Sequence, residues 1–385
     1  MDFTETEEQA LLREAVGRLA AGFGRAYYTE RARARQPQTE LWEAAAKAGY
    51  VGVCLPQEYG GGGMGVAELA IVAEELGARG CPLMLLMVSP ALCGTIIARF
   101  GTPEQRRRWL PGLASGELKM SFAITEPDAG SNSHRLATVA TRDGGDWLLR
   151  GSKYYISGVD EAGAVLVVTR TGVDEASGRG RLSLFVVDTD APGLTATPIP
   201  MDVQVPEQQF TLFLDDVRVP AERLLGSEGD GLRQVFLGLN PERIIGGAGT
   251  LGVARNALAR AAEYARGRQV WRAPIGSHQA IAHPLAAARI EVELAWLATQ
   301  KAAWSYDRGL PQAGEWANMA KYAAAEAALH AVDAAVQAHG GNAFASEYGL
   351  AAMWAGVRVL RTAPVSREMI LNHIAERSLG LPRSY

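Results

Sequence analysis

Residues 239–258 contain the side chains whose types and spacing most directly suggest chemistry. Glu242 is a carboxylate that could accept a proton from a substrate. Three glycines nearby have the G-x-G-x-x-G spacing with which a loop cradles a dinucleotide pyrophosphate: Gly247, Gly249 and Gly252. The segment could therefore hold a phosphate, hold a catalytic base, or only pack against its neighbours.

The local context disfavours a dinucleotide loop, which has to follow a buried strand and open a helix. Only Ile244 and Ile245 separate the charged Arg243 from the glycines, and Pro241 fits the start or a kink of a helix better than a central strand. We therefore predict that the glycines lie inside a helix. Each then costs about 1 kcal/mol against alanine, so the close approach of a neighbouring helix or a ligand has to justify them.

The elements that must position this segment fall into three regions, 1–118, 119–228 and 229–385. The first has helical periodicity from Phe3 to about Ala114, and Thr102 before Pro103 is typical of a helix start. The second contains short runs rich in β-branched and aromatic residues, which predict an antiparallel β-barrel or sandwich. The third is rich in alanine and predicts a four-helix bundle. We expect an α+β multi-domain fold and no doubly wound sheet, because no helical window alternates with the strands.

The composition argues against several classes of function. The chain has 385 residues, is 48% hydrophobic and carries a formal net charge of -4, so it can bury large cores but lacks the basic character of nucleic-acid binders. Its histidines show no paired ligand spacing, which argues against a metal site. Its N-terminus is acidic and does not look like a leader. A reducing, cytoplasmic location fits the cysteines, which form no C-x-x-C pair: Cys54, Cys81 and Cys93.

One uncharged stretch, residues 80–98, has the length of a membrane span. Ser89 and Pro90 interrupt it in the middle, and Gly94 and Thr95 dilute its apolar character. We therefore expect a buried, kinked pair of helices here and no membrane span.

Three well-separated motifs resemble signatures of the acyl-CoA dehydrogenase family. In chain order they are FAITEPDAGS at 122–131, RQVW at 268–271 with GSHQ at 276–279, and QAHGG at 337–341 with Glu347 and Tyr348 after it. Shorter matches lie at residues 55–61, 215–220 and 225–226. The resemblance covers nearly the whole chain. It implies a homotetramer or homodimer that binds FAD, oxidises the Cα–Cβ bond of an acyl-CoA and passes electrons to an electron-transfer flavoprotein.

The resemblance also implies which residues surround the flavin ring. Those expected along the isoalloxazine are Phe122, Ile124 and Thr125, with Tyr155 and Ser157 standing where the family more commonly has Trp and Thr. Ser131, on the loop after the first of these, is expected to meet a phosphate or the substrate.

A second set is implied to hold the ADP half of FAD from across a dimer interface: Arg268, Trp271, Gln279, Gln337, Gly340 and Gly341. Ser366 and Glu368 fall where the family has residues beside the adenosine diphosphate. These types suit the task, because a guanidinium offers forked, permanently charged donors and paired glycines let backbone N–H groups approach a phosphate.

The catalytic base departs from the commonest family pattern. The usual glutamate position falls on Pro364, or on Ala363 if the count slips by one, and neither residue can take a proton. Isovaleryl- and long-chain acyl-CoA dehydrogenases instead carry the base one residue before an arginine, and Glu242 precedes Arg243 here. Glu242 is therefore the candidate base. The alternative is that it only stabilises the first turn of a helix through the macrodipole.

The candidate base also predicts a substrate pocket. Gly246 lies one turn after Glu242, on the same helical face, so an acyl chain beside the base would meet hydrogen there and not a side chain. Together with Ser131 and Arg243, Gly246 is our candidate substrate-binding set. The pattern predicts room for branched, long or ring-bearing acyl groups.

Three other functions stay open on the same scaffold. One is a dehydrogenase of acyl-carrier-protein thioesters. Another is a subunit of a heterotetrameric dehydrogenase with little activity alone, which Pro364 favours, as does Asn132 where the first motif usually has Asp. The third is a flavin oxidase or monooxygenase, which a glutamate in place of an aspartate base disfavours.

Overall fold

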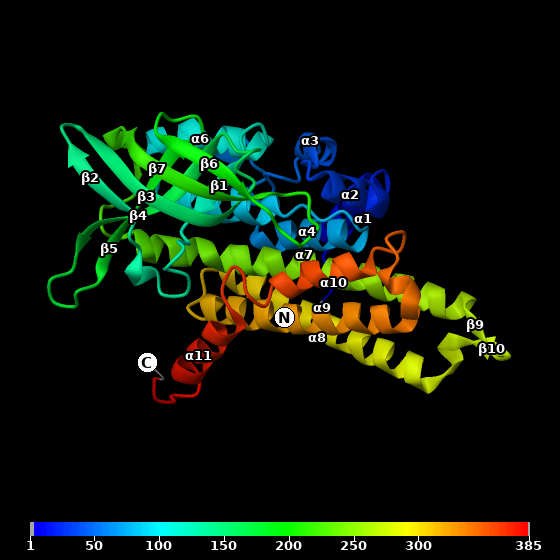
Figure 1. Cartoon of the computed structure of the whole chain (residues 1–385). Helices are drawn as coiled ribbons and strands as arrows, with labels where there is room; N and C mark the ends of the chain where they lie inside the picture. Colours follow the sequence, from blue (N-terminus) through cyan, green and yellow to red (C-terminus); the bar gives the residue numbers. More distant parts are fainter. Residues whose placement is uncertain (1–3, 384–385) are drawn as a thin grey trace.

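The computed structural model of the chain describes residues 4–383, so Phe3, where the helical pattern was expected to begin, lies outside the described residues. Figure 1 shows a sheet at one end of an elongated molecule and long helices that run from beneath it to the opposite end. The N-terminal helices cover the upper side of these long helices, beside the sheet. The order along the chain is helices, sheet, helices, as predicted.

The N-terminal region is helical, and its elements are α1 (Glu7–Ala21), α2 (Gly24–Ala34), α3 (Thr39–Lys47), η1 (Gln57–Tyr59), α4 (Val66–Ala78), η2 (Met87–Gly94), α5 (Thr95–Phe100) and α6 (Pro103–Ser115). Thr102 caps α6 through a hydrogen bond from the Gln105 amide, and Pro103 occupies the first turn, which confirms the predicted helix start.

The uncharged stretch 80–98 is buried, as predicted, but it forms one helical segment and not two. Its middle, η2, is a π-helix that contains Pro90 and continues directly into α5. A wider π turn accommodates the proline within the helix, so no break is needed. Within residues 4–383, no helix is both long and apolar enough to cross a membrane.

The middle region is one eight-stranded sheet. Its strands are β1 (Met120–Ala123), β2 (Val139–Asp143), β3 (Asp146–Ser157), β4 (Ala164–Val173), β5 (Gly180–Asp188), β6 (Leu194–Ile199), β7 (Gln209–Val219) and β8 (Leu224–Leu225), and the short helices η3 (Ser133–Arg135) and η4 (Ala221–Arg223) interrupt them. The pairing order is β6-β7-β3-β2-β4-β5-β8, with β1 on β4.

The prediction of an antiparallel barrel is wrong in two respects. β1 pairs with β4 in parallel, because helices precede it and it enters the sheet without a hairpin. The end strands β6 and β8 do not pair with each other among the described residues, so the sheet does not close. Its two faces bury separate apolar clusters, one of which is shared with α5 and α6.

The C-terminal region contains three long helices, α7 (Gly231–Gly267), α8 (Gln279–Asp307) and α9 (Ala313–His339), and two short ones, α10 (Leu350–Val359) and α11 (Arg367–Arg377). Strands β9 (Gln269–Val270) and β10 (Ala273–Pro274) with η5 (Ile275–Ser277) join α7 to α8, and η6 (Gly340–Phe344) follows α9. Instead of four matched helices, the three long ones pack with α4 in a core rich in alanine.

The glycines of α7 allow α4 to approach closely, which confirms the expectation that a neighbouring helix justifies them. A Cβ on Gly252 would overlap the Glu74 carbonyl oxygen, and a Cβ on Gly77 would lie 2.5 Å from the Gly249 carbonyl oxygen. Close contact between two backbones therefore requires hydrogen at these positions. The G-x-G-x-x-G spacing serves helix packing, not a phosphate.

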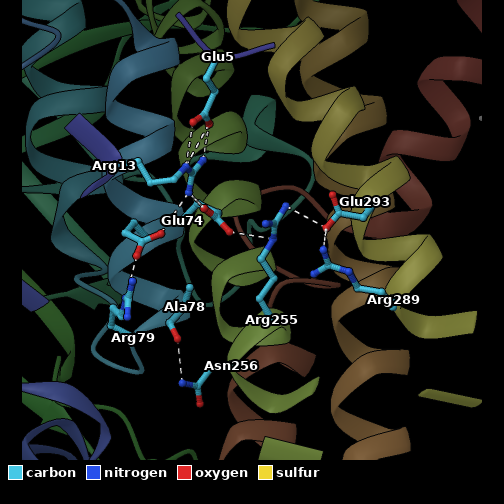
Figure 2. A network of polar contacts seen from close by, with 10 residues as sticks. Glu5, Arg13, Glu74, Ala78, Arg79, Arg255, Asn256, Arg289 and Glu293 are labelled. Atoms are coloured by element: carbon cyan, nitrogen blue, oxygen red, sulfur yellow. Dashed lines mark hydrogen bonds and ion pairs between the residues drawn. The ribbon is translucent and has the colours of Figure 1, made fainter. Parts of the chain in front are cut away.

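A network of ion pairs centred on Glu74 ties the N-terminal helices to α7 and α8 (Figure 2). The Glu74 carboxylate on α4 is fully buried between Arg13 of α1 and Arg255 of α7, whose Nε lies 2.9 Å from it. Arg255 also reaches Glu293 of α8 at 3.1 Å. A buried carboxylate with two arginine partners is well compensated, and removing either side would leave an uncompensated buried charge.

Candidate active site

Glu242 lies in the middle of α7, which begins at Gly231, so the first-turn explanation of this carboxylate is wrong. Pro241 sits inside the helix and does not start it. The side chain is buried, at 6% exposure, and its Oε2 atom has no hydrogen-bond partner among the described residues. Burial raises the pKa of Glu242 to about 8, although Arg243 and Lys321 act in the opposite direction.

Arg243 and Lys321 supply the positive charge around this carboxylate. Arg243 is buried and its Nη1 atom donates to Asn318 Oδ1 on α9 at 2.8 Å. Burial lowers the pKa of Arg243 to about 10, against the opposing charge of Glu242. Lys321, also on α9, is fully buried. These cations sit between α7 and α9, where they help a buried acid to ionise.

Gly246 lies one turn after Glu242, but its surroundings are not open. A Cβ at this position would lie 2.7 Å from the Met87 Sδ atom of η2 and 3.6 Å from a methyl group of Leu360. The predicted gap beside the base is therefore filled by the flexible end of a methionine. Any acyl chain on this face of α7 would be bounded by Met87 and not by the glycine alone.

The segment that carries the base in many relatives closes the same face. Leu360 ends α10, and the residues after it lead through Pro364 to Val365, whose carbonyl oxygen accepts a hydrogen bond from Lys321 Nζ at 2.6 Å. No acid takes the place of Pro364 in this segment, as the sequence already indicated.

The residues predicted to line the flavin ring gather at one end of the sheet. Phe122 is on β1, Ile124 and Thr125 follow it, and the Thr125 carbonyl oxygen accepts from the Tyr154 amide at 2.8 Å. Ser157 donates its hydroxyl to Gln209 Oε1 at 2.9 Å, which joins β3 to β7. Tyr155 has a positive φ of 58° and is half-exposed.

A buried ion pair that the sequence reasoning missed supports this loop. Lys153 is fully buried on β3, and its Nζ donates to Glu126 Oε1 at 2.8 Å and to the Ile124 carbonyl oxygen at 3.1 Å. Glu126 also accepts from the amides of Ala137 at 2.6 Å and Thr138 at 3.0 Å. The pair therefore fixes both ends of the exposed loop that carries Ser131. A lysine within an otherwise apolar strand was the available signal.

The second predicted set lies far from the first. Figure 1 places β9 and β10, which flank Trp271, at the end of the long helices away from the sheet. Trp271 is 90% exposed. Tyr264 at the end of α7 stacks on His339 at 4.1 Å and accepts from Asn342 at 2.9 Å, which joins this hairpin to the turn after α9. Exposed side chains of the set gather here: Arg268, Gln279 and Gln337.

Gly340 and Gly341 form an open backbone turn at this end. Gly340 has a φ of +57°, and no atom lies within 4 Å of a Cβ built on either glycine. Such a turn exposes N–H groups that a phosphate can approach. Nearer the base, Ser366 caps α11 by accepting from the Met369 amide at 3.3 Å, and Glu368 is exposed. The donor types in both sets fit a flavin dinucleotide.

No three metal-ligating side chains come together in residues 4–383. Two sets of flavin-type contacts and a buried, unpartnered carboxylate instead define the class of flavin-dependent dehydrogenases. Residues 6–117, 121–217 and 229–379 match the N-terminal, middle and C-terminal domains of acyl-CoA dehydrogenase. The chain belongs to the acyl-CoA dehydrogenase family, which confirms the resemblance.

Several known proteins are similar over the whole chain. Acyl-CoA dehydrogenase FadE12 of Mycobacterium tuberculosis (strain ATCC 25618 / H37Rv) is 57% identical over 385 residues, 100% of this chain and 99% of the relative. The glutaryl-CoA complex of glutaryl-coenzyme A dehydrogenase superposes with a TM-score of 0.93 at 31% identity, over 100% of this chain and 98% of that one. The FAD complex of PigA gives 0.91 at 26% identity, over 99% and 100%. The chain is thus an oxidoreductase that dehydrogenates acyl-CoA with FAD as cofactor.

Proposed function

We propose that this enzyme desaturates an acyl-CoA between Cα and Cβ with Glu242 as the base that removes the α-proton. The observation that carries the proposal is a buried carboxylate whose Oε2 has no hydrogen-bond partner in the described chain. Burial raises the pKa of Glu242 to about 8, which brings it near the working pH where a general base is most effective. Pro364 leaves the usual base position without an acid.

The cations beside Glu242 keep it usable as a base. Arg243 is held by Asn318 at 2.8 Å, and this bond fixes its charge between α7 and α9. With Lys321, it favours the ionised carboxylate that must accept the proton. Arg243 is also our candidate for binding substrate from this side, because its Nε atom has no hydrogen-bond partner in the described residues.

FAD, when bound, supplies the acceptor for the hydride that leaves Cβ. We assign its isoalloxazine to Phe122, Ile124, Thr125, Tyr155 and Ser157, with Ser131 close to a phosphate or the substrate. Pro364 has no backbone N–H to offer the thioester carbonyl, so this chain has to polarise that carbonyl with other donors.

The ADP half requires a second copy of the chain in this proposal. The set of Arg268, Trp271, Gln279, Gln337, Gly340 and Gly341 is at the far end of the long helices, so it cannot reach the flavin ring site of its own protomer. Ser366 and Glu368 complete the site nearer the base. Trp271 and Phe344, 90% and 73% exposed, would be covered in such a homodimer or homotetramer.

The acyl chain lies along α7 between Gly246 and Met87 in this proposal. Because a flexible thioether bounds the pocket, it can adjust to acyl groups of different width. We propose an electron-transfer flavoprotein as the partner that takes the electrons.

The test is to mix the purified yellow protein anaerobically with a panel of acyl-CoA thioesters and to follow flavin bleaching near 450 nm. Bleaching by wild type and its loss in Glu242→Gln with FAD retained supports the proposal. A colourless chain would indicate a dependent subunit, bleaching only by carrier-protein thioesters would change the substrate class, and oxygen consumption would indicate an oxidase.

A further inference from the structure

Lys321 is a buried lysine that the function described so far uses only as a source of charge. Its side chain is fully buried on α9, and its Nζ donates to the Val365 carbonyl oxygen at 2.6 Å. Among the residues that the structure describes, no carboxylate forms an ion pair with it, although Glu126 does so with the other fully buried lysine, Lys153. A buried ammonium without a paired charge is costly, so this one needs an explanation.

The position of Lys321 places it between the base and the neighbouring segment. α9 approaches α7 so closely that a Cβ on Gly247 would lie 3.8 Å from the Lys321 Cα atom. Asn318, one turn earlier on α9, binds Arg243. Two successive turns of α9 thus reach across to α7 and to residues 363–365, on either side of Glu242.

Several elements contribute charge to this cluster. Burial lowers the pKa of Lys321 to about 8, and Arg243 lowers it further, against nearby carboxylates on α11, α9 and α7: Glu368, Glu326 and Glu242. On the side of η2, the thiol of Cys93 lies near enough to Glu242 for that charge to raise its pKa, after burial. On α11, burial and then Arg243 lower the pKa of His373. The ammonium of Lys321 and the guanidinium of Arg243 are the cations that favour ionised Glu242.

We propose that Lys321 is a positioning residue for the reaction. Its hydrogen bond holds residues 363–365 in place beside α7, and its charge favours the ionised form of the buried Glu242 carboxylate. The inference rests on the proposed role of Glu242. It also explains how a segment whose proline has no N–H is held, because the anchor is the carbonyl of the next residue.

The test compares Lys321→Met, which removes the charge and the donor, with Lys321→Arg, which keeps both. The first readout is the pH dependence of the rate of flavin reduction by a saturating acyl-CoA. Loss of the charge makes Glu242 harder to ionise, so the midpoint of the rise in rate should move up by about half a pH unit or more in Lys321→Met. Lys321→Arg should keep the wild-type midpoint.

The second readout does not depend on catalysis. Because burial raises the folded-state pKa of Glu242, wild type should lose stability relative to Glu242→Gln as the pH rises from about 4.5 to about 8, and the difference should level off above that. In the Lys321→Met background the levelling point should move to higher pH. Lys321→Gln gives the same expectation should Lys321→Met not fold.

The outcomes separate the two hypotheses. If Glu242→Gln turns over like wild type, the base assignment fails, while the levelling point still reports whether Lys321 acts on Glu242. An unchanged midpoint and an unchanged levelling point in Lys321→Met overturn the positioning role. A shift of both in Lys321→Met, with neither moved in Lys321→Arg, supports it.

Discussion

Replacing Lys153 with methionine should destabilise the flavin loop more than any surface change. The substitution keeps the apolar stem but leaves the Glu126 carboxylate buried, at 5% side-chain exposure, without its cation. Breaking a buried pair from one side costs about 3–5 kcal/mol. Because Glu126 keeps the amides of Ala137 and Thr138, we expect the lower end, about 3 kcal/mol.

The dependence on pH gives this prediction a sign. Burial alone would raise the pKa of Glu126, but Lys153 and the hydrogen bonds outweigh it and hold the pKa below its ordinary value. The stability that Glu126 contributes is therefore present above its unfolded pKa and lost as the pH falls through the folded one. Without Lys153 the carboxylate should protonate more readily, so the gap between wild type and variant should narrow below about pH 5.

The assay is urea unfolding at several pH values, with FAD held at one concentration because a bound ligand adds to apparent stability. The exposed Lys47→Met is the matched control and should change the unfolding free energy by less than about 0.5 kcal/mol. Adding Glu126→Gln to Lys153→Met should recover part of the loss. The reasoning would be refuted by a Lys153→Met variant as stable as the control, or by a gap that stays constant with pH.

Three further predictions concern helix packing, the ion-pair network and the second flavin set. Gly252→Ala should lower stability by about 1–3 kcal/mol in urea unfolding, because its Cβ overlaps the neighbouring backbone, whereas Gly267→Ala, with open space around it, should not; equal midpoints would speak against the close approach. Glu74→Ala should cost about 3–5 kcal/mol and the exposed Glu14→Ala less than about 0.5 kcal/mol, and similar losses in the two would contradict the account of the network. Trp271→Ala should leave circular dichroism unchanged but reduce FAD retention and assembly on gel filtration; full retention with an intact oligomer would remove it from the site.

The sequence was sufficient for the order of the domains and for the two residues that matter most to the base. Alanine-rich periodicity predicted long helices, and the pattern after Arg243 correctly placed the glycines inside one of them. The start of α7 was missed, because residues 231–240 have no strong cap and a proline follows, which local rules take for a beginning. That error made the macrodipole a plausible role for Glu242, which its position in mid-helix excludes.

The missing parts depend on contacts between segments distant in the chain. Nothing local to Gly246 indicates that Met87, from another region, fills the space beside it. The pairs of Lys153 with Glu126 and of Lys321 with the Val365 carbonyl join residues 27 and 44 positions apart. Strand pairing likewise follows from tertiary packing, so the parallel placement of β1 could not be predicted from its composition.

The rate of flavin reduction in Glu242→Gln tests the central claim most directly. The variant is nearly isosteric, so it should bind FAD and fold as wild type does. On anaerobic mixing with an acyl-CoA that bleaches wild type, we predict a rate lower by at least about 10²–10⁴-fold, the usual contribution of a general base. Bleaching at the wild-type rate would contradict the assignment of Glu242 as the base.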